Sequence, residues 1–152
     1  MRARSAVAAA LAALACAAPR APRYVPRSRD IAITTVPLLV KELAATYPFL
    51  KKDFAPGGVL DGKEVYAFSP STIVVVEGDT LHLQLVNPED DVHTFALPDL
   101  AVPLAPQRVT TATYVAAHAG IYRFTCSVPT HLPSMWGQLV VLSPSAVGDG
   151  AR

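Results

Sequence analysis

The chain has 152 residues, of which 51% are hydrophobic and 16% charged, so it is long and apolar enough to bury the core of one domain. Its formal net charge of +1 hides an asymmetry, because four of the 13 basic residues lie within the first 23 positions: Arg2, Arg4, Arg20 and Arg23. From Tyr24 onward nine Lys and Arg stand against 12 Asp and Glu, a net charge of −3, which excludes the basic surface that nucleic-acid binding needs.

The first 18 residues have the order of features typical of a signal peptide. Two arginines precede an apolar run over residues 6–15, which is too short to span a bilayer as a helix and ends in an A-x-A cleavage pattern before Cys16. We therefore expect an exported protein, in the periplasm or on the extracellular face of a membrane. A lipoprotein signal, in which a lipidated Cys16 tethers the chain to the membrane, is one alternative, and a retained anchor is another.

Residues 19–62 are interpreted as a linker and an N-terminal extension with a short helix. Residues 20–30 are rich in Pro and Arg, and a first strand is expected over residues 30–35. Apolar residues with helical spacing predict a helix over residues 37–47, with Pro37 at its start and Pro48 ending it. Residues 48–62, with their Pro and Gly, are expected to form a loop.

From residue 63 to residue 142 the pattern is β throughout. The alternation is clearest where Leu81, Leu83 and Leu85 share one face of a strand. Short strands at a spacing of about 8–12 residues predict an all-β antiparallel sandwich, followed by a flexible tail over residues 143–152. The expected strands are residues 64–68, 72–77, 80–87, 92–97, 108–115, 120–126 and 136–142.

The strongest functional signal is the ten-residue run that begins at Cys126 and ends at Met135. It contains His131, and His93 stands 33 residues upstream of Cys126. Cys126 is the only thiol beyond the leader, so an internal disulfide is excluded. Strand ends that meet at one end of a sandwich would bring the four side chains together, and two imidazoles, a thiolate and a thioether suit a copper ion that exchanges one electron.

Residues 63–142 resemble the cupredoxins, the small blue copper proteins. The resemblance rests on residues 66–80, on the His-Thr-Phe run at 93–95, and on residues 120–137, where the Cys-x4-His-x3-Met spacing is similar to that of the azurins. It implies a cupredoxin-like Greek-key sandwich that holds one copper ion, cycling between Cu(I) and Cu(II). It also implies a role for each of five residues: His93, Cys126 and His131 as equatorial ligands, Met135 as the axial ligand, and Thr94 as a hydrogen-bond partner of the Cys loop.

Two other arrangements of the metal site follow from departures within this pattern. The segment around His93 is also similar to the copper domain of cytochrome oxidase subunit II, whose binuclear site needs a second Cys where this chain has Thr130. Thr130 therefore favours one copper ion over two. A carboxylate from the acidic turn at residues 89–91 in place of Met135, as in red copper relatives, is the second alternative.

The function expected from these features is one-electron transport rather than autonomous catalysis. We expect a monomer that exchanges electrons with redox proteins such as cytochromes or a membrane oxidase, docking through an apolar patch of Pro98, Leu132 and Pro133 around the edge of His131. The alternatives are a copper-binding component of a membrane oxidase or another copper oxidoreductase, and a periplasmic copper-delivery protein. Four His and two Met in the whole chain provide few ligands for either alternative.

Overall fold

The computed structural model describes residues 23–131 and 134–147, so the predicted signal peptide and Cys16 lie outside the described residues. None of the helices within these ranges is long and apolar enough to span a membrane. In chain order the elements are β1 (Ser28–Leu39), α1 (Leu43–Thr46), η1 (Pro48–Leu50), α2 (Lys51–Phe54), β2 (Val65–Ser69), β3 (Thr72–Val76), β4 (Thr80–Asn87), β5 (His93–Leu97), β6 (Leu100–Leu104), β7 (Arg108–Val115), β8 (Gly120–Thr125), η2 (Pro129–His131), β9 (Trp136–Leu142) and α3 (Pro144–Val147).

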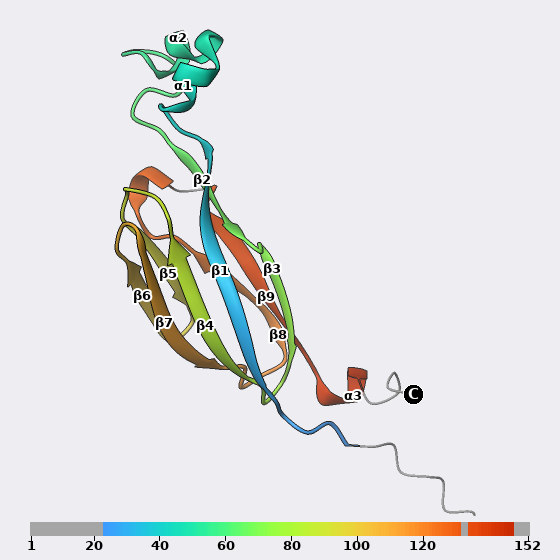
Figure 1. Ribbon diagram of the computed structural model, residues 1–152. Coiled ribbons are helices and arrows are strands. Elements are labelled where there is room, and N and C mark those ends of the chain that lie inside the picture. Colours follow the sequence, from blue (N-terminus) through green and yellow to red (C-terminus); the bar gives the residue numbers. More distant parts are fainter. Residues whose placement is uncertain (1–22, 132–133, 148–152) are drawn as a thin grey trace, which may run out of the picture.

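The strands form a two-layer sandwich, which confirms the predicted fold class (Figure 1). One sheet has the order β2-β1-β4-β7, and the other has the order β3-β9-β8-β5-β6. The sheets are mixed rather than purely antiparallel, because β1 pairs with β4 and β3 pairs with β9 in the parallel sense.

Three phenylalanines from three strands pack together in the core near one end of the sandwich. Phe68 of β2 packs edge-on against Phe95 of β5 and Phe124 of β8, with ring centroids 5.7 and 5.5 Å apart. Side chains two positions apart on a strand share a face. Each phenylalanine therefore places a second buried residue of its segment at the same end of the core: Tyr66, His93 and Cys126.

The predicted helix over residues 37–47 is wrong in its first part, because β1 runs on to Leu39 and only residues 43–46 are helical. Tertiary pairing overrides the local spacing, since Val36 and Pro37 pair with Ala67 and Tyr66 of β2. The β4 pairing of β1 ends at Thr34, so Pro37 lies where only one neighbour pairs with the strand, a position that tolerates proline. The sandwich thus begins at Ser28, well before the predicted start at residue 63.

A buried carboxylate joins the start of the chain to the β3–β4 turn. Asp79 is fully buried and accepts hydrogen bonds from the Tyr24 hydroxyl, the Arg27 and Val76 N–H groups and the Arg29 guanidinium. Burial alone would raise the pKa of Asp79, but these four hydrogen bonds lower it to about 2. Asp79 is therefore ionised at neutral pH and anchors the segment that leads into β1.

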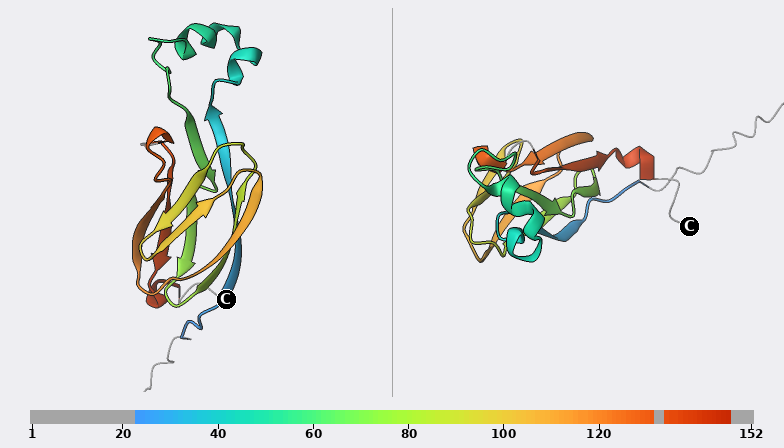
Figure 2. Two further views of the ribbon diagram at one scale, coloured as in Figure 1. Left: turned by 90° about the vertical axis from the view of Figure 1, so that its left-hand side faces the viewer. Right: turned by 90° about the horizontal axis from the view of Figure 1, so that it is seen from above.

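Residues 41–63, which we call the cap, connect β1 to β2 and project beyond one end of the sandwich (Figure 2). The predicted loop over residues 48–62 contains two short helical turns, η1 and α2. The cap is held by its own backbone, because the N–H of Leu60 donates to the Asp53 carbonyl and the N–H of Gly58 donates to the Ala55 carbonyl. A Cβ at Gly58 would lie 2.3 Å from the Asp53 oxygen, so only glycine fits this close approach.

Two further elements differ from the expectation. Strand β6 was not predicted, because its Leu-Ala-Val-Pro-Leu sequence mixes apolar residues without clear alternation. It pairs only with β5, with Pro103 opposite Thr94, at the edge of the second sheet where a proline is tolerated. The predicted tail begins with the short helix α3.

Candidate metal centre

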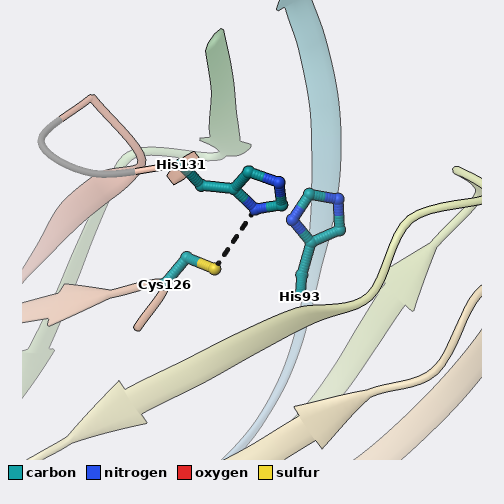
Figure 3. A group of neighbouring side chains, drawn as sticks. All are labelled: His93, Cys126 and His131. Carbon is teal, nitrogen blue, oxygen red and sulfur yellow. Dashed lines mark hydrogen bonds between the residues drawn. The ribbon is translucent and has the colours of Figure 1, made fainter. Parts of the chain in front are cut away.

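Three of the four predicted ligands converge at the end of the core beside the cap. His93 is the first residue of β5, Cys126 directly follows β8, and His131 is the last residue of η2. All three are buried, and one ligand atom from each lies within 4.8 Å of the others (Figure 3). The Cys126 Sγ is 3.7 Å from the His131 Nδ1. No Asp or Glu of the described residues joins this group.

The two imidazoles are in the state that metal binding requires. Burial, followed by the nearby His131, lowers the pKa of His93 to about 4, although Asp91 opposes the shift. Burial also lowers the pKa of His131. Both rings are therefore neutral at pH 7, with a nitrogen lone pair available to a metal ion.

His93 shows most directly that the site is built for a ligand. Both of its ring nitrogens are buried and have no hydrogen-bond partner. Leaving a buried polar atom unpaired costs about 1–3 kcal/mol, and such atoms are rare in folded proteins. A metal ion held between His93, Cys126 and His131 would satisfy one of these nitrogens, so the residues fit copper in both chemistry and placement.

Backbone hydrogen bonds close the loop that carries Cys126 and His131. The Cys126 N–H donates to the Met135 carbonyl at 3.0 Å, and the Met135 N–H donates to the His131 carbonyl at 3.2 Å. Met135 is fully buried, and these bonds place its backbone directly beside both residues. The fourth predicted ligand thus belongs to the same closed loop.

Thr94 lies against the sulfur of Cys126 and the start of its loop. Its backbone N–H and its hydroxyl approach the Cys126 Sγ at 3.4 and 3.7 Å. The same hydroxyl accepts a hydrogen bond of 2.6 Å from the Ser127 N–H. Hydrogen bonds to a ligating sulfur hold it in place and withdraw charge from it, which tunes the reduction potential of a bound metal.

Tyr66 of β2 is a site residue that sequence reasoning missed. Its ring centroid lies 4.6 Å from those of both His93 and His131, so one aromatic ring supports both imidazoles. Its hydroxyl donates to the Asp91 Oδ2 at 2.6 Å and lies 3.1 Å from the Glu64 Oε2. Burial, followed by these two carboxylates, raises the pKa of Tyr66, while its hydrogen bond lowers the pKa of Asp91. The only sequence signal was its place on the buried face of β2, two residues before Phe68.

Replacing Tyr66 by Phe is expected to lower the free energy of unfolding by about 2 kcal/mol, because the hydrogen bond to the half-buried Asp91 carboxylate is lost while the ring remains. Urea denaturation of the metal-free protein measures this value. Tyr122→Phe is the matched control, since that hydroxyl donates only to the exposed His118 carbonyl, and we expect a loss below about 0.5 kcal/mol. Equal losses in the two variants would contradict a special role for the Tyr66 hydroxyl.

Only Pro98 of the predicted docking patch lies within the described residues, and it lies away from His93. Pro98 follows the last residue of β5, and His93 is the first, so the two lie at opposite ends of a strand that spans about 13 Å. Leu132 and Pro133 lie outside the described residues. His131 is only 3% exposed, and it lines a pocket of about 460 Å³ together with Lys41 and Phe54 of the cap.

Comparison with known proteins places the fold among copper proteins. A family model described as a cupredoxin-like domain matches residues 61–141. No curated protein sequence matches the chain.

Several solved structures of copper proteins are similar to this fold. The copper nitrite reductase of Nitrosomonas europaea aligns with a TM-score of 0.56 at 17% identity, over 78% of this chain and 43% of that one. A multicopper oxidase of Pseudomonas thermotolerans aligns with a TM-score of 0.54 at 13% identity, over 79% of this chain and 31% of the oxidase. Auracyanin A, a blue copper protein of Chloroflexus aurantiacus, aligns with a TM-score of 0.49 at 18% identity, over 75% of this chain and 98% of auracyanin A. The chain spans less than half of either enzyme, and at these identities the likeness concerns the fold.

Proposed function

This chain belongs to the cupredoxin-like domain family, and from that premise we propose that it is an exported type 1 copper protein that carries single electrons. The observation that carries the proposal is the buried trio of His93, Cys126 and His131, whose ligand atoms already lie within 4.8 Å of one another. Two imidazoles and a thiolate, with Met135 as a weak axial ligand, form the ligand set typical of electron-transfer copper sites.

The surroundings of the trio favour electron transfer because they resist movement. Bound copper would supply a one-electron couple between Cu(I) and Cu(II). Thr94 holds the sulfur, Tyr66 supports both imidazoles, and the backbone bonds around Met135 close the loop. Ligands held this way keep one arrangement in both oxidation states, so little reorganisation opposes the transfer of an electron.

The distribution of histidines supports a carrier over an enzyme or a delivery protein. The two remaining His, His82 and His118, are exposed on β4 and after β7, away from the buried trio. Among the described residues the trio is the single group of His, Cys, Asp and Glu placed to hold a metal ion. A delivery protein needs ligands that a partner can reach, whereas these three are buried.

Export and partners form part of the same proposal. The arginines and the apolar run of the leader support secretion, with cleavage before Cys16 or lipidation of it. The partners proposed are redox proteins such as cytochromes or a membrane oxidase. The mass of the mature N-terminus separates cleavage from lipidation.

Protein loaded with one equivalent of copper tests the carrier function. We expect a reversible one-electron wave in voltammetry, and rapid electron self-exchange, seen as line broadening in the NMR spectrum of mixed Cu(I) and Cu(II) protein. Zinc-loaded protein is the control, because Zn²⁺ has no redox chemistry. An irreversible wave, or steady turnover of nitrite or of a phenolic substrate with oxygen, would contradict a simple carrier and favour an oxidoreductase.

A further inference from the structure

All four lysines of the chain lie in the cap: Lys41, Lys51, Lys52 and Lys63. Each of them is exposed. The rest of the described chain uses arginine for its positive charges. Lysine is a strongly hydrated, flexible charge that is suited to loose contact with a negatively charged surface, whereas arginine favours fixed pairs. This concentration separates the cap chemically from the sandwich.

The cap carries three acidic side chains, Glu42, Asp53 and Asp61, against its four lysines. Glu42 pairs with Lys41 at 3.8 Å, and the Asp61 carboxylate accepts a hydrogen bond from the Gly57 N–H. Glu64 lies beside the Tyr66 hydroxyl. Within the described parts of the chain, Lys51 and Lys52 form no ion pair. The cap therefore has a net charge of only +1, and Lys51 and Lys52 present positive charge to solvent without an ion-pair partner among the described residues.

Exposed apolar side chains lie among these lysines. Tyr47, Phe49 and Val59 are 49%, 69% and 71% exposed, and the rings of Tyr47 and Phe49 lie 6.2 Å apart. Phe49 precedes Lys51 and Lys52 by only two and three residues. Aromatic residues at the centre of a contact, with charged residues at its rim, are typical of surfaces that bind other proteins.

The cap also stands at the metal end of the molecule. Its Lys41 and Phe54 share a pocket with His131, the ligand nearest to solvent on that side. The chain enters β1 from the opposite end of the sandwich (Figure 1). A membrane tether on the preceding residues would hold that opposite end, which leaves the cap directed toward a protein partner.

We propose that the cap is the docking surface for an electron-transfer partner protein whose contact surface is negatively charged. This inference rests on the proposed carrier function. Opposite charges would steer the partner to the metal end, and Phe49 would lie at the centre of the contact. The electron would leave or enter through the edge of His131, beneath the cap.

Small redox probes of opposite charge test the steering. We expect Lys51→Glu with Lys52→Glu to slow oxidation of the Cu(I) protein by hexacyanoferrate(III), a trianion, about tenfold at about 10 mM ionic strength. Oxidation by the cationic tris(phenanthroline)cobalt(III) should become faster. The matched control, Arg23→Glu with Arg27→Glu, makes the same change of charge at the opposite end of the sandwich and should alter either rate by less than about twofold.

The outcomes separate this inference from the carrier function. Equal effects of the two double variants, with reversible copper redox intact, would overturn the docking surface and leave the carrier standing. Failure of the protein to show a reversible copper couple would overturn the carrier instead. Lysine-dependent cosedimentation with vesicles of phosphatidylserine and phosphatidylcholine, which the Lys51→Glu and Lys52→Glu changes abolish, would assign the cap to a membrane surface and overturn a protein partner.

Discussion

Replacing Cys126 by Ser is expected to abolish the intense visible absorption of the copper-loaded protein and to weaken Cu(II) binding by at least about 100-fold. The absorption arises from charge transfer between the thiolate sulfur and Cu(II), and a serine hydroxyl stays protonated at neutral pH and binds copper weakly. Cys126 is fully buried, and within the described residues only His93 and His131 share its cluster. Absorption titration with Cu(II) measures both effects.

Control variants separate loss of the ligand from loss of the fold. His82→Ala and His118→Ala remove exposed imidazoles outside the cluster and should leave both the absorption and the affinity unchanged. The metal-free Cys126→Ser protein should keep the circular dichroism of the β-sandwich. Retention of the same visible band by folded Cys126→Ser protein would contradict the assignment of Cys126 as a ligand.

Replacing Asp79 by Ala is expected to lower the free energy of unfolding by about 3–5 kcal/mol. The change leaves the buried Val76 N–H, the Arg27 N–H and the Tyr24 hydroxyl without their acceptor, and it removes the partner of Arg29. β1 would then lose the contacts that anchor its start. Because β1 lies between β2 and β4 in the first sheet, this loss affects the pairing of both neighbours. Urea denaturation measures the loss.

The same carboxylate gives this prediction a defined pH dependence. Because the folded pKa of Asp79, about 2, lies below its ordinary value of 3.8, its contribution is complete above about pH 4 and disappears as the pH falls through about 2. The difference between the wild type and Asp79→Ala should therefore shrink between these values. Asp30→Ala, which removes an exposed carboxylate of β1, should cost less than about 0.5 kcal/mol. A difference that stays constant down to pH 2 would contradict the role assigned to the ionised Asp79.

The sequence predicts those parts of the fold that depend on local patterns. Alternation over residues 80–87 defines a strand with the same bounds as β4, and the strand expected over residues 136–142 has the bounds of β9. The Cys-x4-His-x3-Met run identifies the metal loop, because a thiol, an imidazole and a thioether at such short spacing are typical of a loop that wraps a copper ion. Joining His93 to this loop required the added assumption that strand ends meet in a sandwich, and the structure brings the two histidines and Cys126 together.

Other parts depend on contacts that are distant in sequence and could not be predicted from local patterns. Leu39 shows helical spacing, yet it belongs to a strand because Val65 pairs with it across the cap. Tyr66 has an ordinary place on a strand, and only the folded chain shows that its ring contacts two imidazoles from residues 93 and 131. The pairing of Asp79 with Arg29 likewise spans 50 residues.

The cap is a long connection between two strands that adds a surface beyond the end of the sheet (Figure 2). β1 and β2 pair antiparallel up to Leu39 and Val65, and the connection between them is long enough to form α1, η1 and α2 beyond the sheet. This connection lies beside His131, because its Lys41 and Phe54 line a pocket together with that residue. Long connections tolerate such additions at little cost in stability.

The most direct test of the central claim is the visible and electron paramagnetic resonance spectrum of the wild-type protein after addition of one equivalent of Cu(II). We expect an intense blue colour, a narrow copper hyperfine splitting and saturation at one ion per chain, because a single thiolate and two imidazoles bind one copper ion. A colourless adduct with the wide splitting of ordinary tetragonal Cu(II), or saturation at two ions per chain, would contradict a mononuclear type 1 site at His93, Cys126 and His131.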